Sequence, residues 1–245
     1  MKVLLLGGTA EARRLAAQLN RDQRIDVTTS LAGRVTHPTL PVGDARIGGF
    51  GGVDGIVRWI RENATEVMVD ATHPFASTIS RNAETAAEIA DIPLVVLRRP
   101  RWIPGPDDHW IEAATLDHAA ESVAATSHRT FLTIGRQGVP AFAHIDRTWF
   151  LIRSIDAPTG AMPRNRELML ARGPFELEQE ITTMREHGID VVVTKNSGGV
   201  MTESKLMAAR ALAIPVVMIA RPSAPTGVYC TDSVVELEAW LRSRL

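Results

Sequence analysis

The stretch ADIPLVVLRRP at residues 90–100 returns 122 residues later as LAIPVVMIARP at residues 212–222. Each copy carries, directly after an Ile-Pro pair, an apolar run of the length typical of a buried strand. A second match lies upstream, where TEVMVDATHP at 65–74 aligns with IDVVVTKNSG at 189–198. Internal similarity at a nearly constant spacing indicates a duplicated structural unit.

Four further pairs of segments match in the same order along the chain. They are KVLLLGGT with TFLTIGRQ, VTTSLAGR with LIRSIDAP, ARIGGF with LARGPF, and the patterned segments 109–125 and 227–243. Each match is short, but their common order is hard to obtain by chance. The chain is therefore predicted to contain two copies of one unit.

Each copy alternates apolar strands with amphipathic helices. In the first copy we expect strands near 3–7, 25–30, 45–47, 67–70 and 94–98, helices over 10–19, 53–63 and 75–90, and a strand–helix pair over 109–126. Continuous apolar strands between such helices predict a parallel sheet covered on both faces. The expected fold is α/β, with two tandem Rossmann-like domains and a ligand cleft between them.

The repeat also suggests domain boundaries. Residues 1–100 form the expected N-terminal Rossmann-like domain, and residues 129–245 the C-terminal one. Residues 101–128 are a connecting strand–helix segment whose membership stays open. One alternative is that the last strand–helix pair of each copy packs on the neighbouring domain.

Composition narrows the class of protein. Hydrophobic residues make up 45% of the 245 residues, charged residues 22%, and the net charge is −1, which gives no general basic field for nucleic acid. No run approaches the roughly 18 apolar residues of a membrane span, and the single cysteine excludes an internal disulfide. The histidines are scattered and predict no metal site. We expect a cytoplasmic protein without nucleic-acid or membrane partners.

Ligands of parallel α/β sheets bind beyond the carboxyl ends of the strands. Gly7, Gly8 and Thr9 follow the first strand, where glycines let the backbone approach a pyrophosphate and the next helix supplies N–H groups. A full G-x-G-x-x-G is absent, because Thr9 and Ala12 replace its second and third glycines. A purely structural turn remains the alternative.

The second strand ends in TTSLAGR, which offers Ser30 and Arg34 but no carboxylate. An NAD site usually places an acidic residue there, whereas a hydroxyl and a guanidinium suit the 2′-phosphate of NADPH. Arg34 as a solvated loop charge is the alternative. The GGFGG segment, with Gly49, Phe50 and Gly51, is expected to line the same crevice, unless it is only a loop that needs positive φ.

Two unlike polar loops occupy the same strand end in the two copies, DATHPFA at 70–76 and TKNSGG at 194–199. In the first loop, Asp70 or Thr72 as a helix cap with Pro74 in the first turn is one interpretation, and a ligand-facing loop is the other. In the second loop, Lys195 is harder to explain as a cap. We expect it to face an anionic ligand.

The motifs LLLGGTAEAR, DATHPFA, ARGPF and VTKNSGG, in this order, resemble the precorrin-6A reductase family of cobalamin biosynthesis, from Lys2 to about Pro222. The resemblance implies NADPH-dependent reduction of a carbon–carbon double bond in the tetrapyrrole precorrin-6A to give precorrin-6B. The alternatives are a cobalt-precorrin-6A reductase of the same family, a two-domain nucleotide-sugar transferase, and a non-catalytic NADPH- or tetrapyrrole-binding protein. Transient contact with neighbouring pathway enzymes is a further expectation.

The resemblance also implies roles for individual residues. The phosphates of the cofactor would lie on Gly7, Gly8 and Thr9, and its 2′-phosphate on Ser30 and Arg34. The nicotinamide and ribose would meet Asp70, Ala71, Thr72 and His73. The loop after the corresponding strand of the second copy would close over the cofactor or the substrate; its residues are Thr194, Lys195, Asn196, Ser197 and Gly198. The substrate would contact Arg136, Lys195, Gly199, Glu203, Lys205 and Arg221, while solvated charge is preferred for Arg98 and Arg99. His73 and Lys195 are the candidate catalytic residues, with water as an alternative proton source for the macrocycle.

Overall fold

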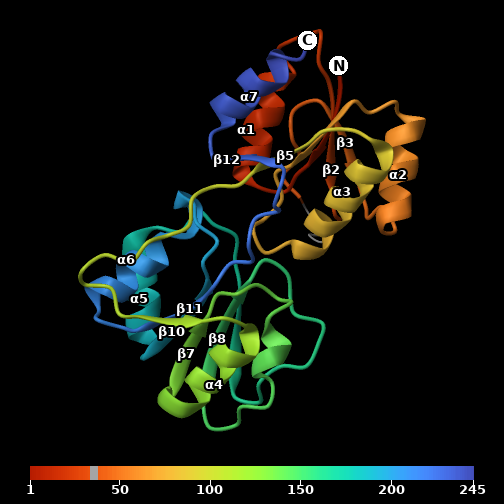
Figure 1. Cartoon of the computed structure of the whole chain (residues 1–245). Coiled ribbons are helices and arrows are strands. Elements are labelled where there is room, and N and C mark those ends of the chain that lie inside the picture. Colours follow the sequence, from red (N-terminus) through yellow and green to blue (C-terminus); the bar gives the residue numbers. More distant parts are fainter. Residues whose placement is uncertain (34–37) are drawn as a thin grey trace. The chain divides into compact units, whose positions relative to one another are not determined.

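The chain folds into two compact units in this computed structural model, which describes residues 1–33 and 38–245 (Figure 1). Unit 1 comprises Met1–Pro100 and Pro222–Leu245, and unit 2 comprises Arg101–Arg221. Each unit holds one six-stranded sheet whose described strand pairs are all parallel. The expected α/β fold with two Rossmann-like halves is confirmed.

Unit 1 is built on sheet A, whose strands lie in the order β12-β5-β4-β1-β2-β3. This is the order of the doubly wound dinucleotide-binding fold, with β12 as its sixth strand. The strands are β1 (Lys2–Leu6), β2 (Asp26–Leu31), β3 (Asp44–Ile47), β4 (Val67–Asp70), β5 (Leu94–Leu97) and β12 (Tyr229–Thr231). The helices are α1 (Ala10–Leu19), α2 (Val53–Glu62), α3 (Ser77–Ala90) and α7 (Val234–Arg242).

Both faces of sheet A are buried along its central strands β1, β4 and β5, as their continuous apolar sequences require. Val3 and Leu5 of β1 pack in one cluster with α1 and α7, whereas Leu4 and Leu6 pack in another with α2 and α3. The two helix pairs cover opposite faces of the sheet (Figure 1). Successive side chains of a strand point to opposite faces, so a strand covered on both sides must be apolar throughout.

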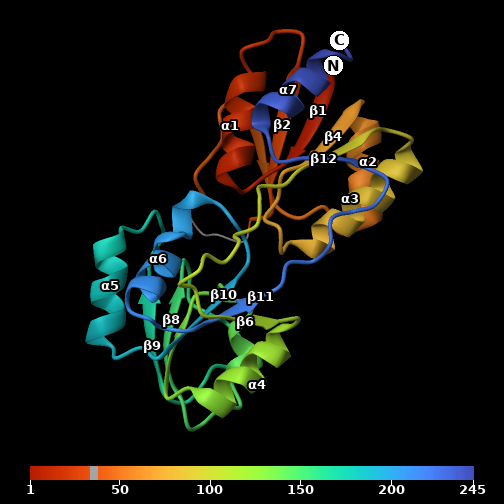
Figure 2. The ribbon, with the colours of Figure 1, turned by 60° about the vertical axis from the view of Figure 1, so that its left-hand side comes forward.

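Unit 2 repeats this plan in sheet B, in the order β6-β11-β10-β7-β8-β9. Helices α5 and α6 cover one face and α4 the other (Figure 2). The strands are β6 (Trp110–Ala113), β7 (Arg129–Leu132), β8 (Trp149–Ser154), β9 (Arg166–Leu170), β10 (Val191–Lys195) and β11 (Val216–Ile219). The helices are α4 (Leu116–Thr126), α5 (Leu177–Glu186), α6 (Ser204–Ala211) and the short 3-10 turns η1 (Val139–Phe142) and η2 (Val200–Thr202).

The two sheets exchange their last strands. Strand β6 follows β5 in the chain but pairs with β11, while β12 follows β11 but pairs with β5. Residues 101–128 therefore belong to unit 2, and residues 222–245 belong to unit 1 rather than to the C-terminal domain expected from the repeat. The repeat shows where each copy begins and ends, but the sheet edge that a terminal strand joins depends on the path of its connecting segment.

The described part of the chain contains no helix with both the length and the apolar character needed to cross a bilayer.

The exchange predicts which unit a core substitution in α7 weakens. Leu237 is fully buried against α1, so Leu237→Ala should cost about 2–5 kcal/mol of unfolding free energy. Hydrogen–deuterium exchange should rise in α1 and β1 and stay unchanged in α5 and α6. Leu206→Ala, in the core of unit 2, is the matched control with the opposite pattern. Faster exchange of α5 in the Leu237 variant, with α1 still protected, would contradict the assignment.

Candidate functional site

The turn from β1 to α1 lies at the carboxyl edge of sheet A. Thr9 caps α1 by accepting a hydrogen bond from Ala12 N at 3.1 Å, and its hydroxyl donates to the Ala71 carbonyl at 2.8 Å. The turn after β1 is thus fixed to the turn after β4. Gly8 has φ of +114°, and a Cβ there would meet no atom within 4 Å. The backbone at Gly8 is therefore open beside the helix N-terminus, as the approach of a phosphate requires.

The ends of β2 and β3 bring together Ser30 and an arginine that the sequence interpretation missed. Ser30 and Arg46 are direct partners in the parallel register, and Arg46 Nη1 donates to Ser30 Oγ at 2.8 Å. Arg34, which the sequence paired with Ser30, lies outside the described residues. Only the register of β2 on β3 places Arg46 beside Ser30, and the local sequence pattern of either strand does not show that register.

The GGFGG segment follows β3 and leads into α2. Gly51 and Gly52 have φ of +84° and +101°, a region that residues with a Cβ rarely adopt. A Cβ at Gly49 or Gly51 would meet nothing within 4 Å. Phe50 contacts Trp59 edge-on, with ring centroids 6.0 Å apart, and anchors the loop to α2. Gly48 also has positive φ, at +130°, so three of the four glycines lie in this region, and the loop still leaves backbone exposed at the sheet edge.

The DATHPFA loop after β4 forms its own turn instead of capping α3. Asp70 Oδ1 accepts from Thr72 N at 3.0 Å and from Thr72 Oγ1 at 2.6 Å. Helix α3 begins only at Ser77, and no side chain caps it, so the expected helix start at 75 and the capping roles of Asp70 and Thr72 are wrong. Pro74 precedes the helix. An Asp side chain that bonds the backbone two residues on favours a turn over a helix.

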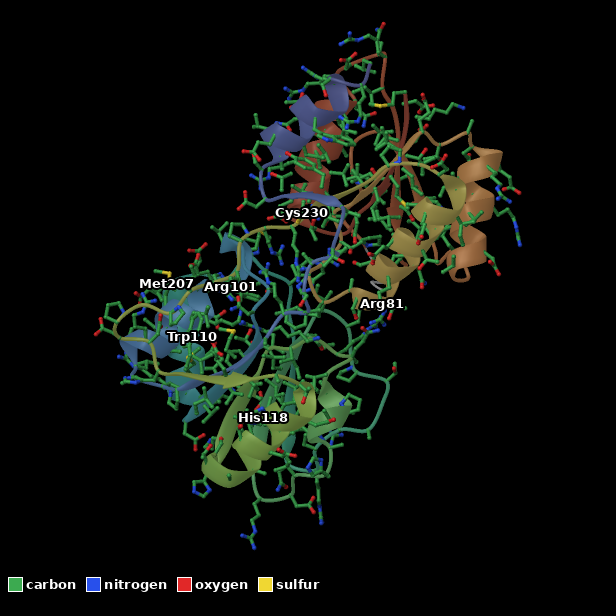
Figure 3. All side chains as sticks on the ribbon, in the orientation of Figure 1. Arg81, Arg101, Trp110, His118, Met207 and Cys230 are labelled. Carbon is green, nitrogen blue, oxygen red and sulfur yellow. The ribbon has the colours of Figure 1, made fainter. Side chains whose placement is uncertain are left out.

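A cavity of about 300 Å³ lies within unit 1 beside this loop. Its walls come from β4, β5, α3 and the segment that returns from unit 2, and Arg81 of α3, labelled in Figure 3, is one of its lining residues. The lining residues are Asp70, Thr72, His73, Pro74, Ser77, Ser80, Arg81, Glu84, Val96, Leu97, Arg98 and Pro222–Thr226. His73 Nδ1 accepts from Phe75 N at 3.2 Å, which orients the imidazole.

The two arginines after β5 are not simply solvated. Arg98 donates to the Pro222 carbonyl and fixes the returning segment over the cavity, and burial lowers the pKa of its guanidinium. Arg99 pairs with Glu11 at 3.2 Å, and both side chains are largely buried. Glu11 stands in the first turn of α1, where its charge would repel a phosphate. The Arg99 ion pair offsets that charge.

In unit 2 the TKNSGG loop has a structural task. The Asn196 side-chain amide accepts from Trp102 N at 2.9 Å and donates to Trp102 O at 3.1 Å. Its backbone carbonyl accepts from Arg221 Nε at 3.0 Å. Asn196 thus holds the chain both where it enters unit 2 and where it leaves. Thr194 and Ser197 are buried, and Gly198 adopts positive φ.

The cationic candidates of unit 2 differ in their surroundings. Lys205 is only 3% exposed, and its ammonium donates to the Thr202 carbonyl and lies 4.8 Å from the Trp102 ring centre. Burial lowers the pKa of Lys195, at the end of β10. Arg136 pairs with Asp156 at 3.4 Å while remaining about one-third exposed. Glu203 precedes α6, and Gly199, at positive φ, precedes η2. Lys195 and Arg136 therefore fit contact with an anion better than Lys205 does.

The residues at the carboxyl edge of sheet A fit a nicotinamide dinucleotide. They combine an open glycine turn at a helix N-terminus, a strand end with a hydroxyl and a guanidinium instead of a carboxylate, and a cavity beyond β4 and β5. Among residues 1–33 and 38–245, no group of three or more His, Cys, Asp or Glu residues is arranged to hold a metal.

The Asn196 clamp predicts a loss of stability on truncation. In Asn196→Ala both backbone groups of Trp102 lose their partner, which should cost about 1–3 kcal/mol in urea unfolding and speed exchange of the Trp102 amide. Ser223→Ala, outside unit 2, is the control. Unchanged stability of the Asn196 variant, with an equally protected Trp102 amide, would contradict the clamp.

Comparison with known proteins places the chain among one group of enzymes. The family model for precorrin-6x reductase CbiJ/CobK matches residues 2–242. A precorrin-6A reductase of Rhodococcus erythropolis is 56% identical, over 98% of this chain and 97% of that protein. A solved structure of CobK precorrin-6A reductase superposes with a TM-score of 0.92 at 35% identity, covering 99% of this chain and 96% of that one. A cobalt-precorrin-6A reductase of Priestia megaterium is 28% identical, over 94% of both chains.

Proposed function

The chain belongs to the precorrin-6x reductase family CbiJ/CobK, oxidoreductases of cobalamin biosynthesis, and we propose that it reduces precorrin-6A to precorrin-6B with NADPH. When bound, NADPH supplies the hydride, and a proton completes the reduction of the carbon–carbon double bond. Two observations together carry the proposal. The chain matches the family model over residues 2–242, and the carboxyl edge of sheet A offers one place for the phosphates of a dinucleotide and another for its nicotinamide. The glycine turn lies at β1, and the cavity lies beyond β4 and β5.

Different residues along the carboxyl edge of sheet A bind different parts of the cofactor. The backbone at Gly7, Gly8 and Thr9 holds the pyrophosphate at the N-terminus of α1. The cavity beyond β4 binds the nicotinamide end of the cofactor. Asp70, Thr72 and His73 line it and orient the nicotinamide ring toward the substrate. The segment Pro222–Thr226 shields this end from water, because Arg98 holds it in place.

Cations at the carboxyl edge of sheet B suit the carboxylates that precorrin-6A carries. Lys195 ends β10, Arg136 follows β7, and Arg221 follows β11. Because α/β sheets bind ligands at this edge, these side chains are the candidates to hold the substrate. His73 of unit 1 and Lys195 of unit 2 are the two residues proposed to act in catalysis. The proton is assigned to water or His73.

The metal-free macrocycle is favoured over its cobalt complex as substrate. Identity is 56% to the precorrin-6A reductase and 28% to the cobalt-precorrin-6A reductase. Because the chain belongs to a reductase family, the alternative that it is a nucleotide-sugar transferase is no longer supported.

Absorbance spectroscopy tests the reaction directly. Purified protein mixed with NADPH and precorrin-6A should lose absorbance at about 340 nm, the nicotinamide band, in step with a shift of the tetrapyrrole spectrum. Cobalt-precorrin-6A is the parallel substrate and should react more slowly. If the protein bound both ligands without oxidising NADPH, the proposed reductase activity would be wrong, and the protein would be a carrier or a sensor.

Substitution of His73 tests how much catalysis depends on a protein acid. His73→Ala should retain measurable turnover, because a conjugated macrocycle can take its proton from water once the hydride donor is positioned. General acid catalysis contributes about 10²–10⁴-fold where it dominates. A fall of about a thousandfold or more, with unchanged NADPH affinity in a fluorescence titration, would identify His73 as the proton donor instead.

A further inference from the structure

A half-buried guanidinium stands at the ends of β2 and β3 with its charge uncompensated. Arg46 lies over the Phe50 ring at 3.9 Å and near Trp59 at 5.0 Å, and burial lowers its pKa. No carboxylate of the described residues lies within ion-pair distance of it. A cation partly withdrawn from water and lacking a counterion favours the binding of an anion.

The hydrogen bonds of Arg46 leave one side of the guanidinium available. Nη1 donates to Ser30 Oγ at 2.8 Å and to Gly48 O at 3.0 Å, and Nη2 donates to Gly49 O at 3.3 Å. The Nε–H and the second Nη2–H have no acceptor among the described residues, and arginine uses such paired donors to bind phosphate. Because Ser30 Oγ accepts from Arg46, its own hydrogen is left to donate as well.

Unit 2 provides an internal comparison, because it also stacks an arginine on the phenylalanine of the repeat. Arg153, near the end of β8, lies 3.7 Å from the centre of the Phe175 ring; β8 corresponds to β2 in the strand order, so this arginine comes from the strand next to the equivalent of β3. Its charge is met by Glu180 at 2.8 Å, and both side chains are buried. Glu180 stands five residues after Phe175, whereas the residue five after Phe50 is Gly55.

Gly55 has its own packing reason to be glycine. A Cβ there would lie 1.7 Å from the Phe50 carbonyl oxygen, so no acidic side chain can occupy this position without moving the backbone. In unit 2 a glutamate of the same unit therefore neutralises the arginine. In unit 1 the matching position, Gly55, cannot carry an acidic side chain. The difference points to a ligand as the counterion in unit 1.

We propose that Arg46, positioned by Ser30 and Phe50, binds the 2′-phosphate of NADPH and makes the enzyme selective for NADPH over NADH. The proposal rests on the proposed function, because it assigns the adenosine end of the same dinucleotide site. In doubly wound folds this end of the cofactor lies at the end of the second strand, where Ser30 and Arg46 stand. The sequence assigned that role to Arg34, and Arg46 is a different residue from a different strand.

Direct binding titrations test this without turnover. Kd values are measured for NADPH, NADH, adenosine 2′,5′-bisphosphate and 5′-AMP on wild type, Arg46→Met and Arg34→Ala. Methionine keeps hydrocarbon over Phe50 and removes the charge. Arg46→Met should weaken NADPH and the bisphosphate by about 10–100-fold and change NADH and 5′-AMP by less than about twofold. Arg58→Met, on the exposed side of α2 in the same unit, is the matched control and should change none of them.

The outcomes separate this proposal from the proposed function. Equal affinity of the wild type for NADPH and NADH would overturn both the selectivity proposed for the enzyme and the role of Arg46. A selective wild type whose selectivity survives Arg46→Met, or is lost only in Arg34→Ala, would overturn the role of Arg46 alone. Equal weakening of NADPH and NADH would show that Arg46 only shapes the loop. Arg46→Lys, which keeps the charge but not the fork, serves if the methionine variant fails to fold, and it should lose part of the selectivity.

Discussion

The pairing of β12 with β5 is the constraint on which unit 1 depends. Without β12, β5 would end sheet A with an unpaired edge, and without α7, α1 would lose the helix that shares its face of the sheet. The same returning segment supplies one wall of the cavity beyond β4, where Arg98 fixes it through the Pro222 carbonyl. The edge of the sheet and the wall of the site are therefore completed by one stretch of chain, and neither is available to residues 1–100 alone.

Duplication has left the two copies with the same framework and different electrostatics. Each stacks an arginine on an equivalent phenylalanine, from different strands, and among the described residues a buried carboxylate pairs with the arginine of unit 2 but not with that of unit 1. Each has a polar loop after its fourth strand. The loop of unit 1 lines a cavity, while the amide of Asn196 in unit 2 is bonded to backbone. A buried ion pair or a saturated amide contributes to the rigidity of its surroundings, whereas an unpaired cation or an open cavity is free to meet a ligand.

Much of the fold follows from the sequence, because period and composition determine it locally. The apolar runs of β4 and β5 and the spacing in α1 predict buried strands and a covering helix within a residue or two of the observed bounds. The exchange of β6 and β12 could be stated only as an alternative, since pairing between distant strands leaves no mark on local pattern. The sequence left Asp70 open between a helix cap and a ligand-facing loop for a related reason: Asp favours helix caps and turns alike, and only the backbone geometry excludes the cap. Arg46 was missed because its neighbour Ser30 is contributed by another strand.

The exchanged strand also sets the order in which the molecule can be completed during synthesis. Unit 2 is one continuous stretch, Arg101–Arg221, and has all its strands once that stretch has left the ribosome. Unit 1 begins first but waits for its sixth strand through the whole of that stretch, roughly 6–24 s at about 5–20 residues per second. During that interval the outer edge of β5 has backbone N–H and C=O groups without a partner strand. The unit that begins first is thus completed after the other, because unit 1 gains its sixth strand only once residues 222–245 have followed unit 2.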